Sequence, residues 1–424
     1  MDTPSRLNAR AFHLPRPLSF WHESMTTRTR QSIFLTLLTF IAFVSLGLPD
    51  AVQGVAWPVI RQDFGRSIGE LSYLLIAGAT GYFSSGAVGG IMMQKLGVGR
   101  VLGISTGLVT LGLLVYVVTP GLWLMIPAAF VIGIGSGAVD AGLNFYAADR
   151  FSTRTMSWLH ACFGIGAMLG PVIMSATLGL GAAWRVGYAV IAVITAILAI
   201  TFLANAHRFD EDIHMPGHTG QRAPLSAGAV ARMPLVWLQI AIFFVMTALE
   251  VIPSVWTTTI LVERFDIATE RAGIWAGLYW GMQAFGRIVI PLMTKNVSMQ
   301  RVLQVGPFGI LLGSILMVID DPNAYRAGIM VIAFSNAALF PGLMSLTPER
   351  LGRGAAVHAI GWQVSAATIG GATIPSLAGF VGQSAGLVLI PVFMVVLSVI
   401  FIGLEAAFRL RADHPDHRAT LERS

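Results

Sequence analysis

Long apolar runs recur along nearly the whole chain, and this pattern limits the possible folds more than any other feature of the sequence. A helix needs about 20 predominantly apolar residues to cross the hydrocarbon core of a bilayer, and the runs are of this order. Charged residues make up only 11% of the 424 residues, and the mean hydropathy is +0.73. Soluble domains contain about 25% charged residues. The sequence therefore predicts an all-α integral membrane protein, because the strand-length alternation of a membrane barrel is missing.

We assign twelve membrane spans, which are separated mostly by short turns. They cover residues 31–57, 69–93, 98–119, 122–148, 155–180, 184–206, 234–261, 268–294, 299–319, 325–347, 354–381 and 385–408. The only long polar connection, 207–233, divides them into six and six. We therefore expect two six-helix bundles, at 31–206 and 234–408, with short tails at 1–30 and 409–424. We expect the chain to act as a monomer in the lipid bilayer.

The positions of Lys and Arg predict how the chain lies in the membrane. Only six of the 27 basic residues fall on the side opposite the tails. They are Arg61, Arg66, Arg185, Arg264, Arg271 and Arg326. Because basic loops stay in the cytoplasm, we expect both termini and the 207–233 linker to be cytoplasmic, in the inner or plasma membrane. Topology thus explains the formal charge of +6, and no nucleic-acid partner is expected.

A carboxylate inside the fourth span is the strongest candidate for chemistry. Asp140 lies within a long apolar run, and Asn144 follows one helical turn later on the same face. Glycines at 133, 135 and 137 allow a neighbouring helix to approach closely. Because burial disfavours a charged carboxylate, this side chain can take up and release a proton as its surroundings change. The alternative is a fixed hydrogen bond between helices.

Two further carboxylates lie inside predicted spans. Asp50 follows Pro49 in the first span, and it is either a second proton or substrate group or a hydrated carboxylate near the outer mouth. Glu250, in the seventh span, could also take part in proton coupling. We favour instead a pairing of Glu250 with Arg287 of the eighth span, which would hold the two helices together.

Polar and aromatic side chains in other spans are candidates for substrate binding. His160 could hydrogen-bond a substrate or shuttle protons, or it could be a packing histidine near the inner interface. The candidates in the second half are Tyr279, Gln283, Asn336, Trp362 and Gln363. Amides and aromatic faces suit a ligand rich in hydroxyl groups. Tyrosine and tryptophan also anchor helices at membrane interfaces, which leaves a second explanation for some of these residues.

The loop between the second and third spans resembles the signature loop of the major facilitator superfamily. The stretch runs Gly90-Ile-Met-Met-Gln-Lys-Leu-Gly-Val-Gly-Arg100. Gly90, Lys95, Gly97 and Arg100 match, but Gln94 stands where the family has an aspartate. A related stretch begins at Gly286-Arg287, toward the end of the eighth span. The resemblance implies the twelve-helix transporter fold, with Gly90, Lys95, Gly97, Arg100 and Arg287 as residues that control gating.

Within the superfamily, the first half is most similar to the fucose permease branch and its bacterial relatives. Val139-Asp-Ala-Gly-Leu-Asn-Phe145 resembles a fourth-span stretch in which a glutamate precedes an asparagine by four positions. Asp50 matches an aspartate in that branch's first span, and Gly81-Tyr82-Phe83 matches its second span. His160 with the residues 164–167 resembles a stretch that faces the substrate. This resemblance implies a sugar substrate that is carried together with protons.

The sequence therefore predicts a proton-coupled secondary transporter of a small polar solute, which works by alternating access. One alternative is an exporter that exchanges protons for drugs or amphipathic metabolites, since Gly166-Ala-Met-Leu-Gly-Pro171 partly matches an exporter motif. Close helix packing is the other explanation of that motif, and we prefer it. A membrane sensor that binds a ligand without moving it is a third alternative.

Enzyme and metal motifs are missing from the sequence. There is no phosphate-binding glycine loop with Lys-Ser/Thr, which argues against transport driven by ATP. There is no His-Glu-x-x-His motif, and the nine histidines form no cluster with ligand spacing. With one cysteine, Cys162, no internal disulfide can form. We therefore expect no enzymatic activity, no metal and no cofactor other than the proton gradient.

Overall fold

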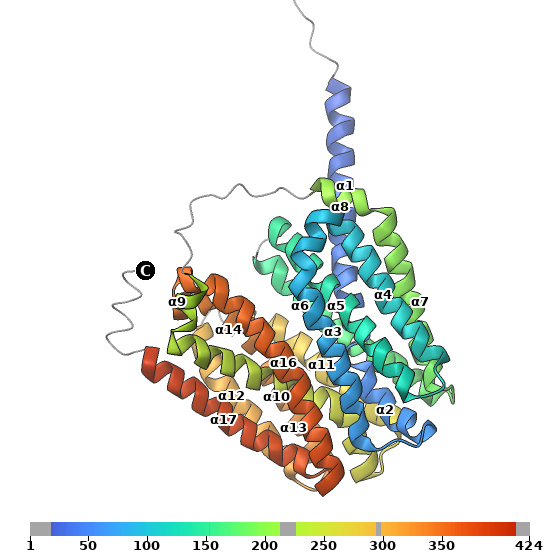
Figure 1. The fold of residues 1–424 in the computed structure, drawn as a ribbon, viewed down its shortest axis with the longest axis vertical. Coiled ribbons are helices and arrows are strands. Elements are labelled where there is room, and N and C mark those ends of the chain that lie inside the picture. Colours follow the sequence, from blue (N-terminus) through green and yellow to red (C-terminus); the bar gives the residue numbers. More distant parts are fainter. Residues whose placement is uncertain (1–17, 152, 213–225, 294–297, 413–424) are drawn as a thin grey trace, which may run out of the picture.

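The computed structural model describes residues 18–151, 153–212, 226–293 and 298–412, and nearly all of these residues are helical. Figure 1 shows the long helices packed side by side, with the first half of the chain (blue to green) beside the second half (yellow to red). No strand occurs within the described ranges. The all-α class predicted from the apolar runs is therefore confirmed.

The described residues of the first half form eight α-helices and one short 3₁₀-helix. Their bounds are α1 Leu18–Gly47, α2 Val52–Asp63, η1 Ile68–Glu70, α3 Leu71–Leu96, α4 Val98–Val118, α5 Leu122–Arg150, α6 Thr153–Gly179, α7 Trp184–Ala204 and α8 Ala206–Asp212. The helix of the first span thus begins at Leu18, inside the segment predicted as a tail, and it projects beyond the other helices (Figure 1).

In the second half, the part of the chain that the structure describes forms nine α-helices. Their bounds are α9 Ala227–Ala231, α10 Pro234–Phe265, α11 Thr269–Met293, α12 Met299–Val318, α13 Pro322–Asn336, α14 Leu339–Ser345, α15 Thr347–Leu351, α16 Arg353–Ala385 and α17 Leu389–Ala412. Two short helices, α8 and α9, lie inside or at the edge of the predicted linker 207–233.

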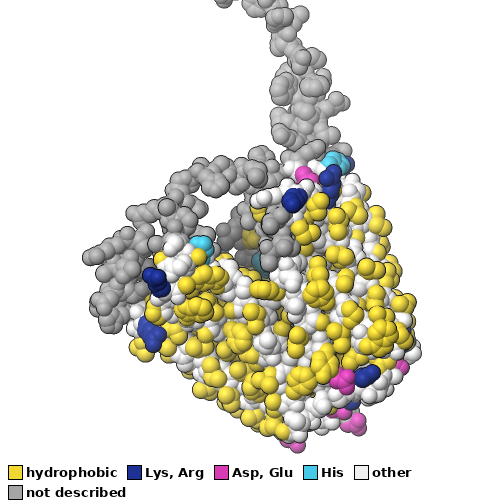
Figure 2. Space-filling model, in the orientation of Figure 1, with side chains coloured by type: hydrophobic (Ala, Val, Ile, Leu, Met, Phe, Trp, Pro, Cys, Tyr) yellow, Lys and Arg dark blue, Asp and Glu magenta, His cyan; other side chains and the backbone are white. Residues whose placement is uncertain are grey.

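Ten helical stretches in the described residues are long and apolar enough to cross a membrane, and they coincide with ten of the twelve predicted spans. The helices α3 and α11 lie on the other two predicted spans, 69–93 and 268–294, and fall outside this set. Figure 2 shows apolar side chains over the flanks, whereas the charged side chains gather at the ends. On α7 the exposed apolar residues recur every three or four positions, at Val186, Val190, Val193, Ile197 and Ile200. Such a stripe suits contact with lipid.

Two of the predicted spans are broken inside the membrane-spanning part. The first span consists of α1 and α2, which are separated by a turn at 48–51 that contains Asp50. Pro49 has no N–H to continue the helix, and its ring interferes with the preceding turn. The tenth span breaks after Asn336, where α13 ends, and resumes at Leu339 as α14. Irregular backbone at membrane depth is tolerated only where it is buried in protein or lines a water-filled cavity.

The two halves meet along α6 and α11, and again where α3 packs on α16. Small residues allow the close contact between α6 and α11, since a Cβ added at Gly164 would lie 3.0 Å from the Cβ of Ala284. This contact extends toward the other end of the pair, where a Cβ at Gly179 would lie 3.6 Å from Glu270 Cβ. Between α3 and α16, Ser72 donates to the carbonyl of Ser376 near the start of α3. The two interfaces place the first half directly against the second.

Candidate functional site

Asp140 lies on α5 and receives hydrogen bonds on both carboxylate oxygens. Tyr82 of α3 donates to Oδ2 at 2.6 Å, and Asn144 donates to Oδ1 at 2.8 Å. All three side chains are half-buried. No ion pair of Asp140 is found among the described residues. The carboxylate is therefore held by neutral donors that leave its charge uncompensated.

The glycines of α5 explain why Tyr82 reaches Asp140. A Cβ at Gly137 would lie 2.6 Å from the carbonyl oxygen of Tyr82, and one at Gly133 would lie 2.9 Å from the Tyr82 nitrogen. Any larger residue at either position would push α3 away from α5. The close approach of a neighbouring helix, which the glycine spacing predicted, is thus present and brings the two polar side chains together.

Asp50 lies within electrostatic range of this group. Its side chain is exposed in the turn between α1 and α2, and its charge interacts with that of Asp140 and with the Tyr82 hydroxyl. Two like charges that interact oppose each other's ionisation, and protonation of either carboxylate relieves the repulsion. We call Asp50, Tyr82, Asp140 and Asn144 the acidic cluster. The structure brings together three of the predicted site residues here and adds Tyr82.

Glu250 and Arg287 form the ion pair that the sequence analysis favoured. Arg287 Nη2 lies 3.2 Å from Glu250 Oε1, and the two side chains are 12% and 10% exposed. The same nitrogen donates to Gln283 Oε1, while Nη1 donates to the carbonyl of His160 on α6 at 3.3 Å. Arg287 thus lies inside α11, where it compensates Glu250 and also links the two halves.

Tyr279 and Gln283 are fully buried and hydrogen-bonded within the second half. Tyr279 donates to the carbonyl of Glu250 at 2.8 Å, and Gln283 Nε2 donates to the Tyr279 hydroxyl at 3.2 Å. These bonds connect α10 with α11. Asn336 lies near the Tyr279 hydroxyl at the break after α13, but neither of its amide atoms makes a hydrogen bond of good geometry within the described residues.

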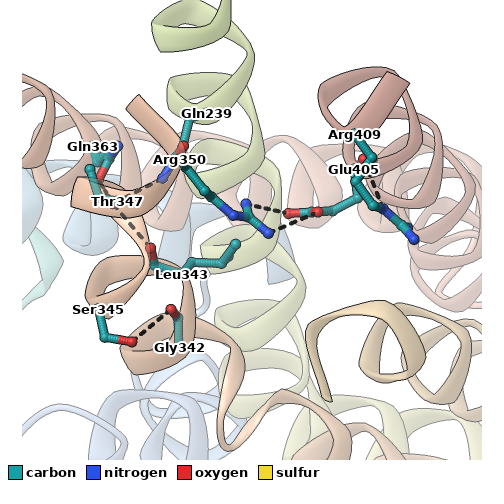
Figure 3. A network of polar contacts seen from close by, with 9 residues as sticks. All are labelled: Gln239, Gly342, Leu343, Ser345, Thr347, Arg350, Gln363, Glu405 and Arg409. Atoms are coloured by element: carbon teal, nitrogen blue, oxygen red, sulfur yellow. Dashed lines mark hydrogen bonds and ion pairs between the residues drawn. The ribbon is translucent and has the colours of Figure 1, made fainter. Parts of the chain in front are cut away.

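The remaining candidates lie at separate places. Gln363 is buried on α16, and its Oε1 accepts from Thr347, which also receives a bond from Gln239 (Figure 3). Trp362 is half-buried and stacks on His358 with 6.2 Å between the ring centroids. His160 is half-buried, with its ring edge-on to Phe43.

The signature-loop residues lie at the junction of α3 and α4. Gly90 is within α3, Lys95 is exposed near its end, and Arg100 is exposed in the first turn of α4. Gly97 has φ 81° between the two helices, a conformation that L-residues rarely adopt. The predicted turn is therefore present, and it needs glycine.

The molecule is hollowed at one end and closed at the other. Figure 2 shows the hollow between the two halves at the end that carries α8 and α9. At the opposite end, Arg61 of α2 pairs with Glu263 of α10. The backbone of Gly69 donates to Gln383 at 2.8 Å, and Ser72 donates to the carbonyl of Ser376 at 3.0 Å. All three contacts cross from one half to the other, and we call them the closed end.

A family model described as Major Facilitator Superfamily matches residues 35–375. The chain belongs to the Major Facilitator Superfamily. This confirms the family resemblance seen in the signature loop.

Among characterised relatives, the glucose/mannose transporter GlcP of Bacillus subtilis is 19% identical over 386 residues, which are 88% of this chain and 94% of that protein. The 3-(3-hydroxy-phenyl)propionate transporter of Escherichia coli is 25% identical over 376 residues, covering 84% and 89%. The sodium-dependent glucose transporter 1A of Mus musculus is 28% identical over 137 residues, 32% of each chain. The match thus spans about a third of the length of the sodium-dependent glucose transporters.

Solved structures of transporters share the fold. The nucleoside transporter NupG, in the form of a mutant, aligns with a TM-score of 0.71 at 13% identity, over 89% of this chain and 99% of that one. A bacterial homologue of the human lysosomal transporter Spinster aligns with a TM-score of 0.70 at 12% identity, over 90% and 98%.

Proposed function

We propose that this protein is a proton-coupled secondary transporter of a small, uncharged polar solute, with a sugar as the first candidate. Its twelve spans would form two six-helix bundles that rock about a central site. The observation that carries the proposal is the acidic cluster. It places Asp140 between neutral donors and beside a second carboxylate, so that proton uptake changes the charge of the site.

The charge balance of the candidate residues favours a neutral solute over a carboxylic acid. Arg287 is compensated by Glu250, whereas Asp50 and Asp140 have no cationic partner among the described residues. A negative site repels anions and attracts protons. The sugar named for the Bacillus relative therefore fits the site better than the aromatic acid named for the Escherichia relative.

The two ends of the molecule support an alternating-access mechanism. The hollow at the α8 and α9 end would let the solute and the proton leave toward the cytoplasm. The closed end would then open when the halves rock in the other direction. In this cycle the acidic cluster is protonated from outside, the neutral site loads the solute, and deprotonation on the cytoplasmic side resets the carrier.

The partial exporter motif has a packing explanation in this structure. Gly170 faces α1 and α2, where an added Cβ would lie 2.8 Å from Val52 Cγ2, and Gly166 faces the backbone of Val44. These glycines bring α6 against the broken first span. The stretch 166–171 therefore does not require an export function, and we retain import as the proposal.

The decisive test is Asp140→Asn in proteoliposomes, with radiolabelled D-glucose as the probe and an inwardly directed proton gradient. We expect accumulation above equilibrium to be lost while glucose counterflow, which needs no proton movement, persists. The matched control is Asp266→Asn, an exposed residue at φ 53°, a conformation that asparagine also tolerates. Undiminished gradient-driven accumulation in Asp140→Asn would show that this carboxylate does not couple transport to protons.

A further inference from the structure

The short helix α8 packs directly on the signature loop. A Cβ added at Gly99 would lie 2.5 Å from the Cα of Ala206, so the loop and α8 touch through backbone. Phe209 of α8 is fully buried, with its ring 5.0 Å from that of Tyr146 and 5.7 Å from that of Phe202. Aromatic contacts of this kind fix the orientation of α8 on the first half.

This orientation directs the carboxylate of Asp210 at the start of α4. Oδ1 of Asp210 accepts a hydrogen bond from the Gly99 nitrogen at 3.3 Å. A Cβ at Gly97 would lie 2.6 Å from the same oxygen, so the carboxylate occupies the space that the glycine leaves. Gly97, the N-cap residue of α4, offers no side-chain cap of its own. A negative charge at a helix N-terminus is stabilised by the unpaired N–H groups and the helix dipole.

We propose that Asp210 is a positioning residue of the transporter: it supplies the carboxylate that the signature loop lacks at Gln94, and thereby fixes the start of the linker on the first half. Only the expected effect of Asp210 on the uptake rate rests on the proposed transport function. The other end of the linker is held by the second half, because α9 packs on α10 and α16 and the Trp237 indole donates to the Ala231 carbonyl at 2.8 Å. The two described ends of the linker, α8 and α9, are therefore each fixed on one half.

The test compares Asp210→Asn with Asp210→Glu in the full-length protein. The first readout is tryptic cleavage after Arg208, which requires α8 to leave the loop and unfold. We expect cleavage to rise roughly twofold to fivefold in Asp210→Asn, the size of effect expected from losing a negative charge at a helix N-terminus, and to stay near the wild-type rate in Asp210→Glu. The matched control is Glu349→Gln, an exposed residue on α15 of the second half.

The second readout is the rate of glucose uptake, which we expect to fall in Asp210→Asn and to be retained in Asp210→Glu. Wild-type cleavage in Asp210→Asn overturns the anchoring, and raised cleavage with an unchanged uptake rate overturns the positioning role. If Asp210→Asn does not fold, Asp210→Ser replaces it, because serine caps helices without a charge. If the wild type itself carries no solute, the proposed function fails, but the cleavage assay still decides whether Asp210 anchors α8.

Discussion

At the scale of single residues, the acidic cluster depends on one contact between α3 and α5, the hydrogen bond from Tyr82 to Asp140. Asp140 and Asn144 were predicted as a pair because i and i+4 residues share a helix face. The pairing of Glu250 with Arg287 was also predicted, and it is confirmed. Tyr82 was missed as a partner, because 58 positions separate it from Asp140 and the contact depends on how α3 packs on α5. Tyr82 follows Gly81, and α5 presents glycines opposite, which is the signal that could have found it.

The binding roles predicted for Tyr279, Gln283, Asn336, Trp362 and Gln363 remain predictions. Tyr279, Gln283 and Gln363 are engaged in hydrogen bonds inside the second half. A single sequence does not determine the rotation of each helix about its axis when polar residues occur on more than one face. Residue types therefore indicated that polar chemistry lies in these spans without indicating which side chains face a solute.

Replacement of Tyr82 by phenylalanine tests the hydrogen bond to Asp140. The ring is retained and only the donor is lost, so we expect a destabilisation of about 1.5–3 kcal/mol, the contribution typical of a hydrogen bond to a charged group. Thermal unfolding in detergent measures it. Tyr73→Phe on the same helix is the control, because Tyr73 is exposed and its ring contact with Phe380 is kept. Equal unfolding temperatures for the two variants would contradict the assigned bond.

A double-mutant cycle tests the ion pair in the second half. Glu250→Gln leaves Arg287 buried without its charged partner, which typically costs about 3–5 kcal/mol. We expect Glu250→Gln combined with Arg287→Gln to be less destabilised than the sum of the single variants. The partly exposed pair Arg66–Glu70 is the control, and breaking it by Arg66→Gln, which keeps the bonds from Ser67 to Glu70, should cost less than about 1 kcal/mol. Additive effects at Glu250 and Arg287 would argue against a coupled pair.

At the scale of the elements, the sequence predicted where helices run better than where they break. The span at 31–57 was read as one helix, although Pro49 is a recognised helix breaker. The break after Asn336 lies just before Pro341, which cannot donate to the carbonyl of residue 337 and whose ring interferes with it, but that span was likewise read as one helix. The early start of α1 at Leu18 was missed because residues before 31 lack the apolar character that defined the spans. The apolar composition located the membrane-crossing segments, but it did not locate the helix breaks inside them or the early start of α1.

Pro49→Ala tests the role of the break between α1 and α2. Alanine restores a backbone donor and favours a continuous helix by up to about 3 kcal/mol, which would turn Asp50 away from Asp140. We expect gradient-driven glucose uptake to fall while the unfolding temperature stays the same or rises. Pro58→Ala, at a proline inside α2, is the control and should leave uptake near the wild-type level. Normal uptake in Pro49→Ala would show that the break does not position the carboxylate.

At the scale of the whole molecule, the closed end makes the direction of opening testable. Arg61 and Glu263 are replaced by cysteine in a Cys162→Ser background and bridged with a short bifunctional thiol reagent. We expect the bridge to abolish uptake and a reducing agent to restore it. The control bridges Asp63 and Arg185, which pair at 2.9 Å within the first half, and this bridge should not stop transport. Continued uptake with Arg61 and Glu263 bridged would exclude separation of the halves at this end.

The family and the helical class could be predicted from one sequence because composition and the signature loop carry them. The association of the halves could not, because it depends on backbone contacts at glycines such as Gly164 and Gly54 that have no distinctive sequence context. The hollow at one end is likewise a property of the arrangement of halves and not of any single helix.

The two interfaces between the halves differ in length, and this difference sets the axis of any rocking motion. The α6–α11 contact runs from the His160–Arg287 bond to the approach of Gly179 to Glu270, whereas the hydrogen bond and ring contact between α3 and α16 lie near the start of α3. A rotation that keeps the longer contact uses α6 and α11 as its pivot. In the proposed cycle the greatest widening would then fall between the far ends of α3 and α16, and this side of the hollow would form the exit for the solute.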